Sequence, residues 1–191
     1  MYEWGRGVEQ SDEKAAQWYR KGAEQGVEKV QLRMGFRYQQ GQGVTKSEEE
    51  CVYWLTKAAE HGNPRTQVCL GMLFSHCDGA SRSDAEAARW FKKAADQGNA
   101  KAQSCLAFQY LKGHGVGQSE VEAVRWLKKA ADQGDAYSQC QLGAQFMLGH
   151  GVTQNEAEVV RWFKLSANQG HVNAQCSLGR LFRKGLWCNT E

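Results

Sequence analysis

Apolar side chains recur along the chain at the spacing of an amphipathic helix. Between residues 47 and 62 they follow one another at intervals of three, one and three residues, on one helical face: Cys51, Trp54, Leu55 and Ala58. Ser47 precedes this stretch and Glu50 follows three residues later, a pattern typical of a capping box. The pattern predicts a helix that begins after Ser47 and ends at Gly62, where a left-handed residue would stop it.

A second type of helix is predicted directly after that glycine. Asn63 is a good N-cap, and Pro64 falls at the first helical position, where its missing N–H is harmless. Aliphatic and aromatic residues then pair four positions apart: Met34 with Tyr38, Leu70 with Phe74, Leu106 with Tyr110, Leu142 with Phe146, and Leu178 with Phe182. A glycine follows the aliphatic residue in most copies, for example Gly35 and Gly71, and predicts close approach of a neighbouring helix.

The two helix types alternate with a fixed period of 36 residues. Tryptophan marks it most clearly, at Trp18, Trp54, Trp90, Trp126 and Trp162. Such a period is the signature of a solenoid, in which each repeat buries its apolar face against its neighbours. We therefore predict an all-α fold of ten helices in a right-handed α-α superhelix. We expect a single solenoid domain over 1–191, with repeats at 1–26 (partial), 27–62, 63–98, 99–134, 135–170 and 171–191 (partial). The helix that carries the apolar-aromatic pair is the first helix of each repeat, and the helix with the tryptophan is the second.

Glycine-rich turns join the first helix to the second. The turns at 41–44, 113–116 and 149–152 read Gly-x-Gly-Val, and the valine is expected to enter the core. The turn at 77–80 reads Cys77-Asp78-Gly79-Ala80 and lacks both the first glycine and the valine. We expect its conformation to differ locally.

The repeat resembles that of the Sel1-like repeat family, a relative of the tetratricopeptide repeat. Its form is A-x-Q-x-x-L-G-x-x-Y-x-x-G-x-G-V followed by A-x-x-W-x-x-K-A-A-x-x-G, best matched at 102–134 and 136–170. The resemblance implies a helical adaptor or scaffold that binds other proteins. Some secreted members staple each repeat with a disulfide between cysteines eight residues apart. The matching pairs here contain no cysteine: Ala59 and Gln67, Ala95 and Gln103, Ala131 and Gln139.

Composition and charge narrow the function classes further. The 24 basic and 21 acidic residues are interleaved, whereas a nucleic-acid surface needs basic residues gathered on one stripe. No stretch reaches the roughly 18 apolar residues that a membrane span requires. We expect no nucleic-acid partner and no membrane insertion. Seven cysteines without a framework spacing favour a reducing compartment, so we expect the cytoplasm, or the periplasm or a secreted state if a leader has been removed.

Three features could suggest chemistry, and each has a simpler explanation. Ser11 and Lys14 match the S-x-x-K motif of penicillin-recognising enzymes, but the partner motifs are absent and Ser11 occupies a cap position. His76, His114 and His150 could suggest a metal, yet equivalent residues of stacked helices lie about 8 to 10 Å apart, too far to share zinc. The cations of the second helices have acids three or four residues away, as in ordinary surface pairs. We predict neither an enzyme nor a metal or cofactor site, and we interpret the tryptophans as core residues.

Positions that vary between repeats on the first helices are free to form a surface. The face at 29, 33, 36 and 40 and its equivalents mixes cations with large apolar groups. If the first helices line the concave side, as in related repeats, the predicted partner-binding residues are Lys29, Arg33, Phe36, Arg65, Met72, Lys101, Phe108, Lys112 and Tyr137. The alternative, that these residues pack between adjacent first helices, stays open.

The predicted function is a protein-protein interaction scaffold or adaptor for a protein or peptide, with an acidic partner expected from the cations. Two alternatives stay open: a dedicated inhibitor or immunity protein for a toxin or effector, and an enzyme acting on cell-wall compounds. The chain opens at Tyr2, equivalent to Tyr38, and closes after Phe182, so both ends should expose apolar faces. End-to-end self-association is therefore a further expectation, with Leu186 and Trp187 as candidate caps of the far end.

Overall fold

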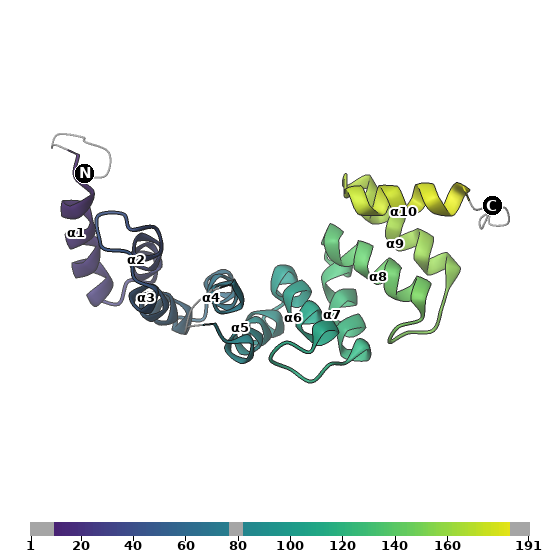
Figure 1. The fold of residues 1–191 in the computed structure, drawn as a ribbon, viewed down its shortest axis with the longest axis horizontal. Coiled ribbons are helices and arrows are strands. Elements are labelled where there is room, and N and C mark those ends of the chain that lie inside the picture. Colours follow the sequence, from purple (N-terminus) through teal and green to yellow (C-terminus); the bar gives the residue numbers. More distant parts are fainter. Residues whose placement is uncertain (1–9, 77–81, 184–191) are drawn as a thin grey trace. The chain divides into compact units, whose positions relative to one another are not determined.

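The structure is a computed structural model that describes residues 10–76 and 82–183. Over these residues the chain forms ten α-helices and no strand (Figure 1). They are α1 (Asp12–Glu24), α2 (Glu28–Gln40), α3 (Glu48–Glu60), α4 (Pro64–His76), α5 (Asp84–Asp96), α6 (Ala100–Lys112), α7 (Glu120–Asp132), α8 (Ala136–Leu148), α9 (Glu156–Asn168) and α10 (Val172–Arg183). The first helices are α2, α4, α6, α8 and α10, and the second helices are the odd-numbered ones. The prediction of an all-α repeat fold is confirmed.

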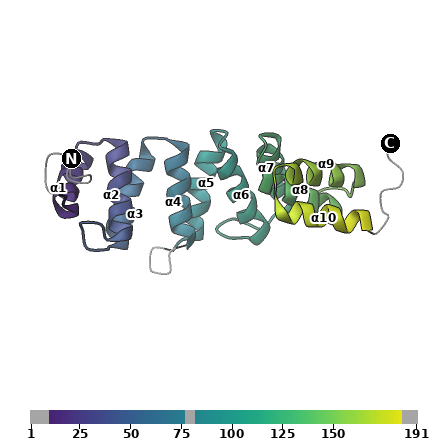
Figure 2. The ribbon, with the colours of Figure 1, turned by 90° about the horizontal axis from the view of Figure 1, so that it is seen from above.

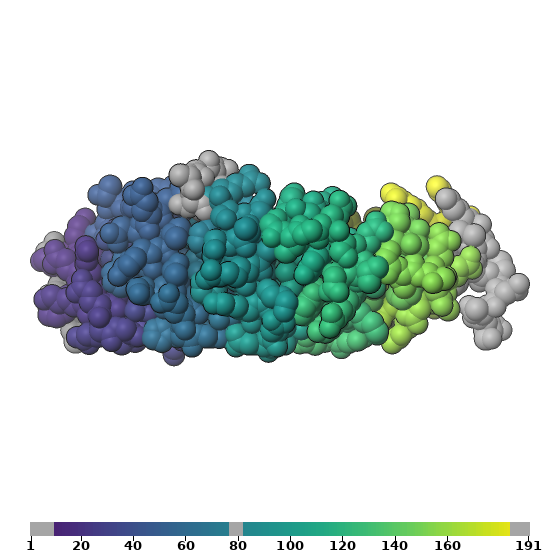
Figure 3. Space-filling model, turned by 90° about the horizontal axis from the view of Figure 1, so that it is seen from below, coloured from purple at the N-terminus to yellow at the C-terminus, as the bar shows by residue number. Residues whose placement is uncertain are grey.

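The helices fall into two compact units, unit 1 (Met1–Ala94) and unit 2 (Ala95–Glu191). Inside each unit, consecutive helices lie side by side and alternate between first and second helices (Figure 2). Their atoms are in direct contact in the space-filling view (Figure 3). The repeat boundaries and the single domain over 1–191 stay predictions.

The tryptophans of four second helices lie in the core, as predicted. Trp54, Trp90, Trp126 and Trp162 are each 5% exposed or less. In unit 1, Trp54 and Trp90 belong to one apolar cluster with Met34, Leu55 and Leu70, residues of α2, α3 and α4. Burial of such large rings supplies much of the hydrophobic free energy that holds neighbouring repeats together.

Trp18 is the exception, because it is 61% exposed. The buried Trp54 packs in a cluster that includes Ala23 of the preceding second helix, α1. Among the described residues no helix precedes α1, so the ring of Trp18 has no such neighbour. The prediction that every repeated tryptophan is a core residue is therefore wrong at this position.

The predicted close approach beside the glycines of the first helices is confirmed at Gly35, Gly71 and Gly143, but not at Gly179. A Cβ atom added to Gly35 would lie 2.7 Å from Cγ of Leu55, and one added to Gly71 would lie 2.7 Å from the ring of Phe91. Leu55 and Phe91 belong to the second helix of the same repeat. The absent side chain thus makes room for a large core residue, which offsets the low helix propensity of glycine.

The predicted capping boxes are half formed. The Ser47 hydroxyl accepts a hydrogen bond from the backbone N–H of Glu50, and Ser83, Ser119 and Asn155 make the same contact in later repeats. The reciprocal contact is not made, because the N–H of Ser47 donates to the carbonyl of Tyr38. The Glu50 carboxylate accepts from the indole N–H of Trp54 instead. The cap residue therefore ties the second helix to the preceding first helix as well as starting it.

Gly62 takes the left-handed conformation that the sequence predicts, and Gly43 of the glycine-rich turn takes it as well. Gly62 has a φ of 92° and Gly43 a φ of 68°, both left-handed. A Cβ on Gly43 would also clash with the backbone of Asp12, so this turn packs directly on the start of the preceding second helix. Val44 packs against the core cluster of unit 1, as expected. The divergent turn at Cys77–Ala80 lies outside the described residues.

A ladder of buried glutamine amides connects neighbouring repeats. The Gln139 Nε2 atom donates to the carbonyl of Ala131 over 3.1 Å, and its Oε1 atom accepts from Nε2 of Gln169 over 2.8 Å. Gln103 makes the same two contacts, with Ala95 and Gln133. The positions eight residues apart are those at which the family resemblance places a disulfide staple. In this chain a hydrogen bond between side chain and backbone joins them.

Candidate protein-binding surface

The predicted partner-binding residues lie mostly on the molecular surface. In unit 1, Lys29, Arg33 and Phe36 of α2 and Arg65 of α4 are exposed, and Met72 is half-buried. In unit 2, Lys101, Phe108 and Lys112 of α6 and Tyr137 of α8 are exposed. The aromatic residues are 37% (Phe36), 41% (Phe108) and 40% (Tyr137) exposed. Their role in binding stays a prediction.

Some of these side chains are held in place by neighbours. The Arg33 guanidinium donates a 2.7 Å hydrogen bond to the Tyr19 hydroxyl and lies over the same ring. The Tyr137 hydroxyl accepts a hydrogen bond from Nε2 of Gln141 over 2.8 Å. Such contacts reduce the entropy that a side chain loses when a partner binds.

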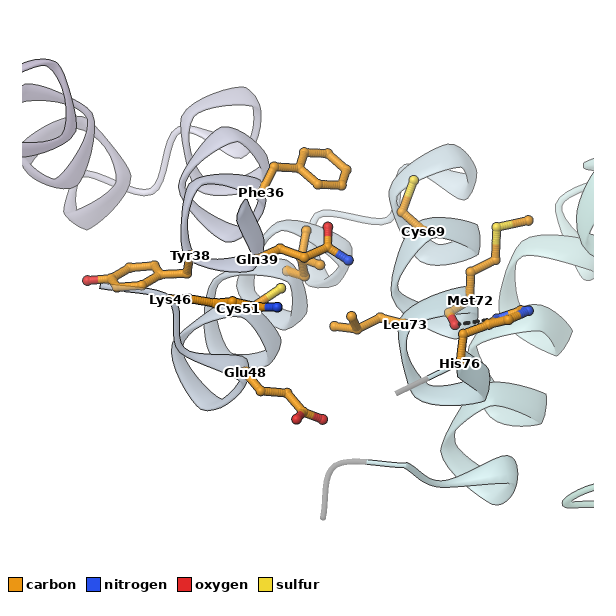
Figure 4. A pocket seen from close by; sticks show the side chains of 11 residues that line it. Phe36, Tyr38, Gln39, Lys46, Glu48, Cys51, Cys69, Met72, Leu73 and His76 are labelled. Atoms are coloured by element: carbon orange, nitrogen blue, oxygen red, sulfur yellow. Dashed lines mark hydrogen bonds between the residues drawn. The ribbon is translucent and has the colours of Figure 1, made fainter. Parts of the chain in front are cut away.

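A pocket opens in unit 1 between the first helices α2 and α4, above the second helix α3 (Figure 4). It has a volume of about 530 Å³. Phe36 and Leu73 extend into the gap from opposite sides, and Glu48 lies at the lower end of α3. The lining combines apolar and sulfur-containing groups with a few polar ones: Phe36, Tyr38, Gln39, Lys46, Glu48, Cys51, Leu55, Cys69, Met72, Leu73 and His76. Two predicted binding residues, Phe36 and Met72, therefore line one concave site.

The thiols of this pocket are unsuited to nucleophilic chemistry. Burial, with a smaller contribution from the neighbouring Glu48 carboxylate, raises the pKa of Cys51 to about 11. Burial also raises the pKa of Cys69. Because the thiolate is the reactive form, both groups are protonated and unreactive at neutral pH.

The Glu48 carboxylate has an unusual environment. Its Oε1 atom is buried and makes no hydrogen bond with any described part of the chain. A buried oxygen without a donor costs free energy, about 1 to 3 kcal/mol or more when charged. Glu48 carries no functional signal in the sequence, since an acid at the first position of a helix is ordinary.

Unit 2 contains a smaller pocket at the same repeat position, three periods later. It has a volume of about 200 Å³ and is lined by Phe146, Met147, Gln154, Asn155, Glu156, Val159 and Leu181. Glu156 corresponds to Glu48 and Leu181 to Leu73. Here the acid is exposed, and Nε2 of Gln154 donates to the carbonyl of Met147 over 3.3 Å. In this lining Val159 stands at the position of Cys51, whereas Ser177 and Arg180, which correspond to Cys69 and Met72, do not line the pocket.

The other candidate groups have structural roles. The Ser11 hydroxyl accepts from the N–H of Lys14 and donates to Glu13, which confirms it as a helix cap. His76 contacts the carbonyl of Met72, and His150 lies 3.6 Å from the Glu120 carboxylate. Within residues 10–76 and 82–183, no group of three His, Cys, Asp or Glu residues is placed to hold a metal ion. Cys77 and Asp78 lie outside these ranges.

The cations of the second helices form the surface pairs that their spacing predicts. Arg89 lies 3.4 Å from Glu86, Arg161 lies 3.2 Å from Glu158, and Lys128 lies 3.3 Å from Asp132. Two of these lysines have a second role, which their spacing does not predict. Lys93 and Lys129 lie over the rings of Trp90 and Trp126, 4.3 and 4.1 Å from the ring centroids. These cations shield the buried indoles at the surface.

Comparison with known proteins decides the family. The Sel1 repeat model matches residues 1–27, 29–63, 70–99, 100–135 and 136–171. The chain belongs to the Sel1 repeat family. Sel1 repeats bind protein partners and are generally interaction scaffolds. No helix in the described ranges has both the length and the apolarity needed to cross a bilayer.

Solved structures of other Sel1 repeat proteins share this fold. A protective antigen present in uropathogenic Escherichia coli strains is 35% identical with a TM-score of 0.87, and the match covers 100% of this chain and 41% of the antigen. A Sel1 repeat protein from Oxalobacter formigenes is 32% identical with a TM-score of 0.83, covering 95% of this chain and 75% of that one. The chain thus spans less than half the length of the antigen. No protein with a curated description matches it.

Proposed function

We propose that this Sel1 repeat protein is an interaction scaffold that binds an acidic protein or peptide on the surface of its first helices. The observation that carries the proposal is the repetition of exposed cations and large apolar side chains in register. Position 29 and its equivalents carry Lys29, Arg65 and Lys101, and position 36 and its equivalents carry Phe36, Met72 and Phe108. Aromatic and arginine side chains are enriched among the residues that dominate binding energy at interfaces.

The charge of the first helices supports an acidic partner. In α2, α4, α6, α8 and α10 the only carboxylate is Glu28, which accepts a hydrogen bond from the Thr66 hydroxyl. The second helices carry acids and bases in pairs. A surface of one charge sign attracts a partner of the opposite sign and accelerates its association.

A double substitution on α6 tests the proposal. Affinity purification from the native cell, followed by mass spectrometry, would identify partners of the wild-type protein. Phe108→Ser with Lys101→Glu removes one apolar group and reverses one charge on the first-helix surface. We expect a partner that binds this surface directly to lose affinity by at least about 10-fold in titration calorimetry.

The matched control makes the same chemical changes on a second helix. Leu165 of α9 is 41% exposed and its neighbour Lys164 is exposed, so Leu165→Ser with Lys164→Glu is equivalent in type. This control should bind as the wild type does. A partner that tolerates the α6 variant, or that loses binding equally in both variants, would overturn the proposal.

We also propose that the protein works in a reducing compartment. The described cysteines Cys51, Cys69, Cys105, Cys140 and Cys176 are all free thiols. The glutamine ladder joins the positions that a disulfide would staple in other members. Fractionation of the native cell with an antibody against this chain would test the location, and recovery from the periplasm or the medium would contradict it.

A further inference from the structure

The first helices of unit 2 carry two different stripes on the surface proposed for binding. Along α6 the exposed residues of the stripe are Lys101, Phe108 and Lys112. At the equivalent positions one repeat later, α8 carries Tyr137, Ala144 and Leu148. Tyr137 and Leu148 are 40% and 51% exposed. A stripe with two cations and a stripe without charge therefore occupy matching positions on two first helices of the same unit.

Two interactions place the start of α8 close to α6. Burial raises the pKa of the Cys105 thiol in α6; Lys101 partly offsets this rise, and the carboxylate of Asp135, the N-cap of α8, adds to it. A charge shifts the pKa of a thiol in this way only from nearby. The Nε2 atom of Gln133, two residues before Asp135, also donates to Oε1 of Gln103 in α6 over 2.8 Å. One partner can therefore contact both stripes.

The spacing along the α6 stripe matches that of a second α-helix. Phe108 follows Lys101 by seven residues and Lys112 follows it by eleven, which correspond to about 10.5 and 16.5 Å along the helix axis. A partner helix parallel to α6 presents residues at the same two distances on one of its own faces. A strand does not, because residues on one face of a strand are about 6.6 to 6.8 Å apart and no multiple of that spacing equals either distance.

The two stripes also require a partner with two different sides. In an amphipathic helix the charged and the apolar residues form neighbouring stripes that both run lengthwise. In a strand successive side chains point to opposite faces, so its polar and apolar residues cannot both contact one surface. An acidic stripe complements the cations Lys101 and Lys112, and an apolar stripe beside it complements α8.

We propose that the surface of α6 and α8 binds an acidic amphipathic α-helix that lies lengthwise along both helices. Two acidic residues of the partner, eleven positions apart as Lys101 and Lys112 are, pair with these lysines. An apolar residue between them contacts Phe108, and the apolar stripe covers Tyr137 and Leu148. This inference rests on the scaffold function proposed above and specifies the secondary structure and the charge pattern of the partner.

Fluorescein-labelled peptides test the helical pattern directly. The reference peptide is an alanine-rich helix with leucines along one side and two glutamates eleven residues apart beside them. In the matched peptide the second glutamate moves by two residues, which rotates it by about 200° around the helix without changing the composition. A third peptide carries a central proline, which breaks the helix. By fluorescence anisotropy, we expect the reference peptide to bind at least about 10-fold more tightly than either of the others.

An exchange of charge assigns this binding to α6. Lys101→Glu should weaken the reference peptide at least about 10-fold, because like charges then face one another. A peptide with lysine in place of the facing glutamate should restore the affinity, which also shows that the variant is folded. The matched variant Lys164→Glu changes an exposed lysine of α9 and should bind the reference peptide as the wild type does.

The outcomes distinguish the two proposals. Equal binding of the three peptides to the wild type, no rescue of Lys101→Glu by the lysine peptide, or an equal loss in Lys164→Glu would overturn the helix assignment. If a partner recovered from the native cell nevertheless loses affinity for the Phe108→Ser, Lys101→Glu variant, the scaffold proposal still stands. If none of the peptides binds, the helix assignment fails, and the affinity purification decides the scaffold proposal separately.

Discussion

The two pockets occupy the same repeat position and contain the same pair of residue types, yet their acids differ in burial. Glu48 and Leu73 in unit 1 correspond to Glu156 and Leu181 in unit 2. The Glu48 Oε1 atom is buried without a hydrogen bond, whereas Glu156 is exposed. The larger pocket also includes Cys69, Met72 and His76 of α4. The repeated residues give both pockets the same position, and the non-repeated residues around them decide the volume of each pocket and the burial of its acid.

The largest expected effect concerns the framework that both units share. Trp54→Ala and Trp162→Ala each remove a nearly buried ring, so each should lower the free energy of unfolding by about 3 to 5 kcal/mol. Trp18→Ala removes a ring that is 61% exposed and should cost less than about 1 kcal/mol. Chemical denaturation followed by circular dichroism measures all three.

The comparison between units sharpens this prediction. If Trp54→Ala and Trp162→Ala destabilise the chain to a similar degree, the repeat framework is equivalent in the two units. A Trp18→Ala variant as unstable as the other two would contradict the exposed position of that ring.

A medium effect is expected at the glycines of the first helices. Gly35→Ala places a Cβ atom 2.7 Å from Cγ of Leu55, and such overpacking costs about 1 to 3 kcal/mol. At the equivalent Gly179 a Cβ atom meets no described residue within 4 Å, so Gly179→Ala should stabilise the chain by up to about 1 kcal/mol through helix propensity. Thermal melts of the two variants should shift in opposite directions, and shifts of the same sign would show that the contact with Leu55 does not decide the outcome.

The smallest effect concerns the pH dependence of the unit 1 pocket. In the folded chain the pKa of Cys51 is raised from its ordinary value of 9.0 to about 11, so the folded state retains the thiol proton longer than the unfolded state does. The stability that this contributes is present below pH 9 and is lost as the pH rises towards 11. Replacing Cys51 with Val, the residue at position 159 in unit 2, should flatten the fall in stability over this range.

Alkylation with iodoacetamide provides an independent measurement. At pH 8 the exposed Cys176 should react at least about 10-fold faster than Cys51, because only an accessible thiolate is alkylated. Mass spectrometry of the digested protein would report both rates. Rapid labelling of Cys51 in the folded protein would contradict its burial.

Much of the fold could be predicted from the sequence because the repeat makes local signals reinforce one another. Ser47, Gly62 and the apolar stripe of Trp54 each indicate the same helix, and the structure confirms it. Trp18 shows the limit of this reasoning, because its residue type and spacing match the others but its burial depends on a neighbouring helix. A repeat pattern predicts which face can be buried, and the neighbour decides whether it is.

The pocket was harder to predict, since it depends on relations between distant positions. Phe36 and Met72 occupy a position of the first helices that varies between repeats, so the sequence predicted both as binding residues. Both line the pocket. Glu48 could not be selected in this way, because each of the described second helices, α1, α3, α5, α7 and α9, begins with an acidic residue. The available signal was the change from Arg37 to Leu73 one repeat later, which removes a basic neighbour from an acid 25 residues earlier in the chain.

The glutamine ladder has a consequence for how the array can change in length. The buried amide of Gln139 bonds to Ala131 and Gln169, and the equivalent residues recur 36 positions away. Removal of residues 135–170 would place Gln175 eight residues after Ala131, the spacing it now has to Ala167. Excision or duplication of a whole repeat therefore restores the amide contacts, whereas an insertion or deletion between Ala131 and Gln139 would change the spacing of eight residues on which they depend.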